Sequence, residues 1–146
     1  MKLAKNNKII DLPTVNDDAK LTFLEGKNLP FSVKRIYYIS GADPNLPRGY
    51  HAHKTNKQFL ICLQGSLTLV LDDGQHRETL VLNNPQQGVL VANNVWHEMH
   101  DFKRDTILLV LASENYNESD YIRIYPQFHK YIRNNGHDPK KTKHSI

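Results

Sequence analysis

Short runs of β-forming residues, separated by residues that favour turns, follow one another along most of this 146-residue chain. The candidate strands cover residues 9–12, 21–25, 33–40, 49–53, 58–63, 66–71, 76–82, 88–91, 96–102, 106–112 and 121–125. Turn residues lie between them, as at Gln64-Gly65 and Asp72-Asp73-Gly74. This series of evenly spaced short strands predicts an all-β fold, either a double-sheet jelly roll or a closed barrel. Near the end, Pro126 can open one short helix over residues 127–133.

The length and composition predict one ordinary globular domain. With 39% hydrophobic and 23% charged residues, we expect a domain over residues 1–133 and a flexible, basic tail over 134–146. No apolar run approaches the roughly 18 residues that a membrane helix needs, and the basic N-terminus lacks an apolar signal segment. We therefore expect a cytoplasmic protein with no membrane partner. The single Cys62, in an apolar run, is expected to fill the core.

The net charge of +4 is concentrated at the C-terminal end. Residues 129–146 hold five basic residues against one acidic residue, which leaves 14 basic and 14 acidic residues in positions 1–128. A short basic tail is ordinarily solvated, so we do not expect a nucleic-acid partner. The sequence also contains no cysteine pair for zinc and no glycine-rich phosphate loop.

Two histidines two residues apart, His51 and His53, lie in the predicted strand 49–53 and should project from the same side of it. Four residues separate His53 from Gln58, and six more separate Gln58 from Gly65. This spacing resembles the first motif of the cupin superfamily, whose metal-binding members carry glutamate at the position of Gln58. The missing carboxylate removes the anionic metal ligand, so we expect no metal and no cofactor. The histidine pair instead indicates acid–base chemistry.

Four ordered blocks carry a more specific resemblance. They are LPFSVKRIYY at 29–38, RGYHAHK at 48–54, VWHEMHDF at 95–102, and LVLAS at 109–113 with DYIR at 120–123. The chain resembles the bacterial sugar-nucleotide 3,4-ketoisomerases of the cupin superfamily, also called dTDP-4-keto-6-deoxyglucose 3,4-oxoisomerases. The resemblance implies a cupin jelly-roll barrel and a homodimer in which N-terminal strands pair across subunits. It is weakest over 16–22 and 135–146, and the first of these departures leaves open the configuration of the product at C4. The sequence also leaves open which sugar is finally made.

The resemblance implies an isomerase that moves the ketone of a dTDP-linked 4-keto-6-deoxyhexose from C4 to C3 through an enediolate. Such an enzyme serves the biosynthesis of 3-amino-3,6-dideoxyhexoses for surface glycans. The C4 carbonyl acidifies the hydrogen on C3, and imidazole can accept and return protons near neutral pH. We expect His51 to be the base. His53 can then shuttle a proton between the two oxygens or polarise the carbonyl, and the sequence leaves these individual roles open.

The substrate also requires donors for the enediolate, cations for the pyrophosphate and an aromatic surface for the base. Arginine suits bidentate phosphate contacts, aromatic rings can stack, and a glutamine amide can bind sugar hydroxyls. The expected substrate-binding residues are Arg35, Tyr37, Arg48, Gln58, Trp96, His97, Tyr121 and Arg123. Packing is the alternative interpretation for His97, Trp96 and Tyr121.

Two other function classes stay open on the sequence. One is a metal-dependent cupin enzyme, with ligands from His51, His53, Gln58 and His97. The other is a non-catalytic sugar-binding cupin, in which the histidine pair only hydrogen-bonds its ligand. Metal analysis of the purified protein tests the first, and solvent deuterium incorporation into the sugar tests the second.

Overall fold

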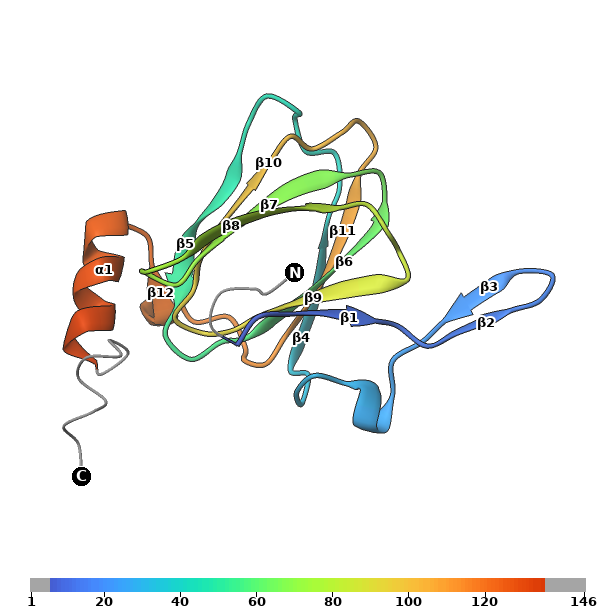
Figure 1. The fold of residues 1–146 in the computed structure, drawn as a ribbon, viewed down its shortest axis with the longest axis horizontal. Helices are drawn as coiled ribbons and strands as arrows, with labels where there is room; N and C mark the ends of the chain where they lie inside the picture. Colours follow the sequence, from blue (N-terminus) through green and yellow to red (C-terminus); the bar gives the residue numbers. More distant parts are fainter. Residues whose placement is uncertain (1–5, 136–146) are drawn as a thin grey trace.

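The computed structural model describes residues 6–135, which form two five-stranded sheets and a projecting two-stranded hairpin (Figure 1). The strands are β1 Lys8–Asp11, β2 Thr14–Asn16, β3 Lys20–Thr22, β4 Arg35–Ile39, β5 Arg48–His53, β6 Gln58–Gln64, β7 Leu67–Asp72, β8 Arg77–Leu82, β9 Gln87–Val91, β10 Trp96–His100, β11 Ile107–Ala112 and β12 Tyr121–Ile122. Two 3-10 turns, Gly26–Asn28 and Glu118–Asp120, and one helix, α1 at Tyr125–Asn134, complete the described elements. The predicted all-β fold with a short C-terminal helix is confirmed.

The two large sheets have the strand orders β1-β9-β6-β11-β4 and β12-β5-β10-β7-β8. The chain crosses between the sheets at most connections, and every strand pair in them is antiparallel, which is the pattern of a double-sheet jelly roll. Within residues 6–135, β1, β4, β8 and β12 are edge strands. Of the two forms predicted from the sequence, the structure therefore has the double sheet, and the expected barrel is not closed.

The main core fills the space between the two sheets. Leu67, Leu69 and Leu71 alternate along β7, point inward and are fully buried. Cys62 of β6 lies in the same cluster, which confirms it as a core residue. Each aliphatic side chain buried in this way stabilises the fold by about 1.5–3 kcal/mol. This core fixes the spacing of the two sheets that carry the candidate site.

Helix α1 covers the outer face of the second sheet (Figure 1). Phe128 and Ile132, one turn apart, are buried against Ala52 of β5 and Ile122 of β12. A proline in the first turn suits the helix start, and α1 begins two residues before the predicted range 127–133. By packing on β12, the helix holds the segment around residue 120 against β5.

The N-terminal strands differ in whether they pair with the body of the domain. β1 pairs with β9 of the same chain, and Leu12 packs with Phe59 and Leu111 on the outer face of the first sheet. β2 and β3 pair only with each other and project from the body (Figure 1). The predicted strand over 21–25 is shorter, and β2 was not predicted, because Thr14–Asn16 is a three-residue run with no buried residue to mark it.

Residues 136–146 of the expected basic tail lie outside the described part of the chain. Over residues 6–135, no helix has the length and apolar character needed to cross a membrane.

Candidate active site

A cavity of about 360 Å³ brings together most of the residues predicted from the sequence. Its lining comes from β4, β5 and β10 and from the segment around β12: Arg35, Tyr37, Ile39, Arg48, Gly49, His51, His97, Met99, Tyr116 and Tyr121. Six of these ten residues were predicted, and His53 and Gln58 are buried beside them. The cavity therefore lies between the two sheets, where strands distant in sequence meet.

A β-bulge in β5 directs two predicted residues into this cavity. The pairing of β5 with β10 shifts by one residue after the His51–His97 pair, so Tyr50 is an extra residue in β5. In a regular strand Arg48 and His51, three residues apart, would face opposite sides. The bulge allows both to line the cavity. Gly49 has a φ of 90°, and a Cβ there would lie 3.0 Å from the His97 carbonyl oxygen, so a glycine is required.

Three imidazole rings form the centre of the site. The ring centroid of His51 lies 5.0 Å from that of His53 and 4.4 Å from that of His97. The Tyr121 ring packs against the pair, 4.9 Å from His51 and 4.3 Å from His53 between centroids. The predicted shared face of His51 and His53 is confirmed. Their catalytic roles stay predictions.

Burial lowers the pKa of all three histidines. The pKa of His53 falls to about 4, because burial and repulsion from His51 outweigh the attraction of Asp120. For His97, burial and the two neighbouring imidazoles hold the pKa well below its ordinary value. The three rings are therefore neutral near pH 7 and can each accept a proton. Since a proton on one ring disfavours protonation of the others, the cluster takes up protons one at a time.

Hydrogen bonds at Nδ1 orient the two catalytic candidates. His51 Nδ1 lies 3.1 Å from the Gly49 carbonyl oxygen, which can only accept, so Nδ1 carries the hydrogen and Nε2 presents a lone pair. His53 Nδ1 lies 3.1 Å from a carboxylate oxygen of Asp120. Asp120 was not among the predicted site residues. The signal available in the sequence was its position at the start of the DYIR block at 120–123.

Gln58 supports Tyr37 from behind the cavity. The Gln58 side chain is buried, and its Nε2 donates to Tyr37 Oη at 2.8 Å. This contact orients the Tyr37 hydroxyl, and the expectation that Gln58 binds the sugar stays a prediction. Burial raises the pKa of Tyr37 to about 12, so its hydroxyl stays protonated near neutral pH and can donate into the cavity. The Arg35 guanidinium lies 4.9 Å from the Tyr37 ring centroid, which confirms that these two residues share a face.

The side chains do not fit the metal site considered from the sequence. In the described residues, no three or more His, Cys, Asp or Glu side chains are arranged to hold a metal ion. The Gln58 amide nitrogen donates to Tyr37 instead of facing the histidines. A set of neutral side chains offers no charge to a divalent cation.

Trp96 lies on the outer face of β10, which corrects its prediction as a substrate-binding residue. Adjacent residues of a strand face opposite sides, so the inward position of His97 turns Trp96 outward. The indole is 2% exposed and packs with Phe128 of α1. Its Nε1 donates to Glu98 Oε2 at 2.9 Å, and Arg77 donates to the same oxygen. The alternative interpretation of Trp96 as a packing residue is the one that the structure supports.

Arg123 lies outside the cavity lining, and its predicted role as a substrate-binding residue stays a prediction. Its guanidinium forms a two-bond ion pair with Glu118, at 2.8 and 3.0 Å. The guanidinium carbon also stands 4.2 Å from the centroid of the Tyr121 ring. Arg123 therefore supports a ring that lines the cavity. Tyr116, which does line it, was missed, because the sequence ENYNES around it matches none of the four blocks.

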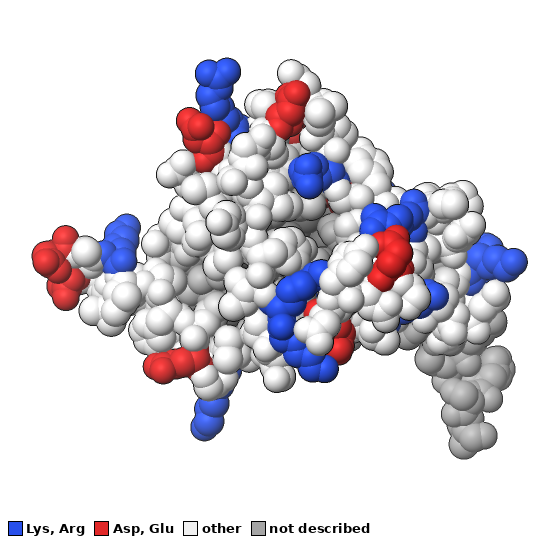
Figure 2. All heavy atoms as spheres, turned by 180° about the vertical axis from the view of Figure 1, so that it is seen from behind, with Lys and Arg blue, Asp and Glu red and all other residues white. Residues whose placement is uncertain are grey.

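Acidic and basic side chains are interspersed on the face shown in Figure 2, with no continuous basic surface. This distribution agrees with the even balance of charges in positions 1–128.

Comparison with known proteins places the chain in a family. Residues 5–133 match the family model described as FdtA: WxcM-like, C-terminal. The chain belongs to this FdtA-like family. A relative from Aneurinibacillus thermoaerophilus, named TDP-4-oxo-6-deoxy-alpha-D-glucose-3,4-oxoisomerase, is 47% identical over 128 residues, which are 86% of this chain and 92% of the relative.

Two solved structures of 3,4-ketoisomerases superpose closely on this one. A 3,4-ketoisomerase from Helicobacter canadensis has a TM-score of 0.86 and 42% identity, over 89% of this chain and 99% of its own. The 3,4-ketoisomerase QdtA from Thermoanaerobacterium thermosaccharolyticum, a histidine-to-asparagine mutant in complex with TDP-4-keto-6-deoxyglucose, has a TM-score of 0.86 and 40% identity. That alignment covers 90% of this chain and 97% of the QdtA chain.

Proposed function

We propose that this FdtA-like protein is a sugar-nucleotide 3,4-ketoisomerase that converts dTDP-4-keto-6-deoxyglucose into a dTDP-3-keto-6-deoxyhexose. The observation that carries the proposal is the pair of neutral imidazoles, His51 and His53, beside a protonated Tyr37 and Arg48. Such a site offers proton acceptors and oxyanion donors in one place, as ketone migration requires. The relatives' names and the sugar nucleotide held by one of them support the same substrate.

The reaction begins with proton removal from C3. His51 Nε2 takes the C3 proton, the C–H electron pair forms a C3–C4 double bond, and the carbonyl electron pair moves onto O4. Tyr37 and Arg48 stabilise the resulting enediolate by donating hydrogen bonds. Transfer of the hydroxyl proton from O3 to O4 and return of a proton to C4 then leave the ketone at C3. A positioned acid–base group of this kind contributes roughly 10²–10⁴-fold to the rate.

The nucleotide half of the substrate is assigned to the cationic and aromatic lining. Arg35 and Arg48 line the cavity and can each contact phosphate oxygens with two donors. Tyr116 and Tyr121 offer ring faces for the base or the sugar. The direct test is NMR of dTDP-4-keto-6-deoxyglucose incubated with the protein. Appearance of a C3 ketone supports the proposal, and an unchanged spectrum after hours at micromolar enzyme contradicts it.

We predict that turnover survives exhaustive EDTA treatment. The reason is the neutral donor set around His51, in which Gln58 replaces the usual glutamate and is engaged with Tyr37. The measurement is the isomerisation rate before and after dialysis against chelator, with elemental analysis of the same samples. Stoichiometric iron, manganese or zinc, whose removal abolishes activity and whose return restores it, would support the metal-dependent alternative instead.

We also propose that residues 1–133 form one domain and that two copies assemble as a homodimer. Two outward residues of β4, Ile36 and Tyr38, are 64% and 69% exposed. The projecting hairpin exposes Val15 and Leu21, and a two-stranded hairpin is marginal in water without a partner. These apolar positions suit a second copy of the chain. β1 uses one edge for β9 of its own chain, so cross-subunit pairing of this N-terminal strand is proposed for its other edge.

The dimer predicts a sedimentation result. At micromolar concentration the protein should sediment with a mass twice that of one chain. The Ile36→Lys variant should shift the equilibrium toward the monomer, because the dimer would bury the lysine charge at its interface. Val81→Lys is the matched control, since Val81 is 59% exposed on β8 of the other sheet. A wild-type protein that sediments as a monomer would exclude the dimer.

A further inference from the structure

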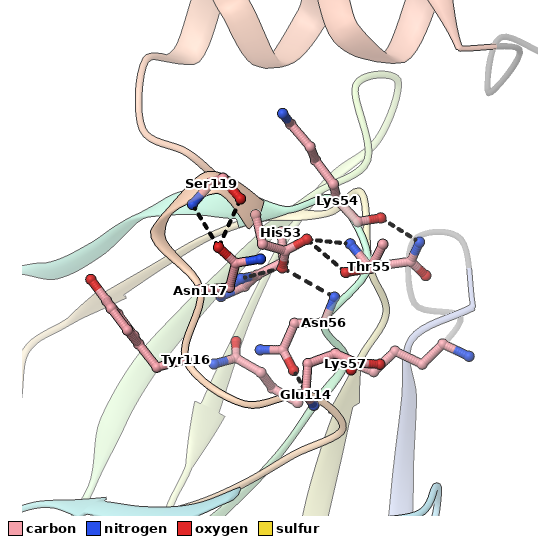
Figure 3. A network of polar contacts seen from close by, with 12 residues as sticks. His53, Lys54, Thr55, Asn56, Lys57, Glu114, Tyr116, Asn117 and Ser119 are labelled. Atoms are coloured by element: carbon pink, nitrogen blue, oxygen red, sulfur yellow. Dashed lines mark hydrogen bonds and ion pairs between the residues drawn. The ribbon is translucent and has the colours of Figure 1, made fainter. Parts of the chain in front are cut away.

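The Asp120 carboxylate is buried at the end of a loop and receives four hydrogen bonds. Oδ1 accepts from the Thr55 backbone N–H at 2.8 Å and from the Thr55 hydroxyl at 2.7 Å. Oδ2 accepts from the Asn56 backbone N–H at 3.2 Å and lies 3.1 Å from His53 Nδ1. Figure 3 shows His53, Thr55 and Asn56 gathered in this network beside the loop that carries Asn117 and Ser119. The carboxylate therefore ties the end of β5 to the segment that begins β12.

Asp120 is ionised in this setting. Burial by itself would raise its pKa, but hydrogen bonds from Thr55 and Asn56 outweigh burial and hold the pKa below its ordinary value. An ionised carboxylate can only accept hydrogen bonds. His53 Nδ1 must therefore carry the hydrogen of the His53–Asp120 bond.

The opposite ring nitrogen, His53 Nε2, is buried and has no hydrogen-bond partner among the described residues. Its ring lies against His51 and Tyr121, both of which line the cavity. With the hydrogen on Nδ1, this nitrogen is an acceptor. A buried acceptor without a partner is suited to a donor that the ligand brings.

We propose that Asp120 is a positioning residue that fixes His53 in the tautomer protonated on Nδ1, so that Nε2 accepts the hydroxyl proton of the substrate. The inference rests on the proposed function and separates two roles that the sequence left open for His53. A lone pair cannot donate to a carbonyl oxygen, so His53 Nε2 accepts the O3 hydroxyl proton and then delivers it to O4 of the enediolate. Polarisation of the C4 carbonyl is assigned to Tyr37 and Arg48.

The network also argues against Asp120 as a proton carrier. Its two oxygens already accept four hydrogen bonds, three of them from Thr55 and Asn56. Two of those donors are backbone N–H groups, which cannot rotate away from the carboxylate to make room for a proton on its oxygens. Asp120 therefore acts on His53 by orientation and charge.

The first test uses the wild-type protein with ¹⁵N-labelled histidine and needs no substrate. We expect the His53 ring to show a protonated Nδ1 and an unprotonated Nε2 in the ¹⁵N spectrum at pH 7. A His53 ring with the hydrogen on Nε2 would overturn the proposal. The ¹⁵N spectrum reports the His53 tautomer without any turnover. Its result is therefore independent of whether the protein isomerises dTDP-4-keto-6-deoxyglucose, and failure of the tautomer proposal is distinguishable from failure of the proposed function.

The second test is Asp120→Asn. The two Thr55 donors should hold the amide oxygen at the Oδ1 position, which places the amide N–H₂ against His53 Nδ1 and favours the other tautomer. We expect the ¹⁵N spectrum to show His53 protonated on Nε2 and turnover to fall about 10²–10⁴-fold, with dTDP affinity within a few-fold. The corresponding exchange in a serine protease triad costs about 10⁴-fold through the same tautomer error.

The matched control is Asp43→Asn. The Asp43 carboxylate is exposed and accepts a hydrogen bond from the Asn45 backbone N–H at 2.9 Å. This variant should leave both the His53 tautomer and turnover unchanged. If Asp120→Asn switches the tautomer and turnover stays near the wild-type rate, the proposal fails. If the variant does not fold, the wild-type spectrum alone decides.

Discussion

His51→Asn should abolish isomerisation while dTDP still binds. Asparagine occupies a similar volume and keeps hydrogen-bonding groups, so the shape of the cavity should persist, but an amide cannot take a proton near neutral pH. Loss of the base should lower turnover by about 10²–10⁴-fold. The affinity for dTDP should stay within a few-fold, because phosphate contacts are assigned to Arg35 and Arg48. Turnover is measured by NMR of the sugar nucleotide, and affinity by calorimetry with dTDP.

Two further variants serve as the control and the comparison for His51→Asn. His76→Asn is the matched control, because the His76 side chain is 71% exposed and lies outside the cavity lining, so both readings should stay at wild-type values. Arg48→Ala should lower affinity and turnover together, as expected for a residue that contacts both the nucleotide and the reacting sugar. Wild-type turnover in His51→Asn would remove His51 from the mechanism.

Trp96→Ala should destabilise the fold by about 3–5 kcal/mol, because the indole fills the space between β10 and α1. Trp96→Phe should cost less, about 1–3 kcal/mol, mainly from the lost hydrogen bond to Glu98. In the folded Phe variant, dTDP affinity should match the wild type, since the indole lies on the outer face of its strand. The measurements are urea unfolding and calorimetric titration with dTDP.

The exposed Leu46 provides the comparison for stability, since Leu46→Ala should stay within about 0.5 kcal/mol of the wild type. The packing role is contradicted if Trp96→Phe keeps the wild-type stability and binds dTDP at least tenfold more weakly. That result would show that Trp96 belongs to the binding site.

The sequence predicted the strands well where core residues recur at every second position. Leu67, Leu69 and Leu71 follow this period along β7, and such a repeat defines the strand and its register. The hairpin was harder to predict, because β2 and β3 bury no residue and so carry no such pattern. Strand ends were misplaced by one to three residues, as at β10, which ends at His100 where the prediction ended at 102.

The sequence predicted which residues form the site, but it predicted less well which side of its strand each residue faces. Strand parity alone excludes Trp96 and His97 from pointing into one cavity, so one of the two could have been rejected from the sequence, although parity does not say which. The same rule would have wrongly excluded Arg48, since the bulge at Gly49 and Tyr50 depends on a backbone conformation that the sequence does not reveal. The position of Asp120 in the DYIR block was visible in the sequence, but its contact with His53 was not, because the two residues are 67 positions apart in the chain.

Solvent deuterium exchange at C3 of dTDP-4-keto-6-deoxyglucose tests the histidine mechanism most directly, since it reports enolisation even when product does not accumulate. In D₂O, the wild-type protein should exchange the C3 hydrogen, and His51→Asn should lose that exchange. If His51→Asn exchanges near the wild-type rate and His53→Asn does not, the base is on His53. Wild-type exchange in both variants would contradict acid–base catalysis by this pair.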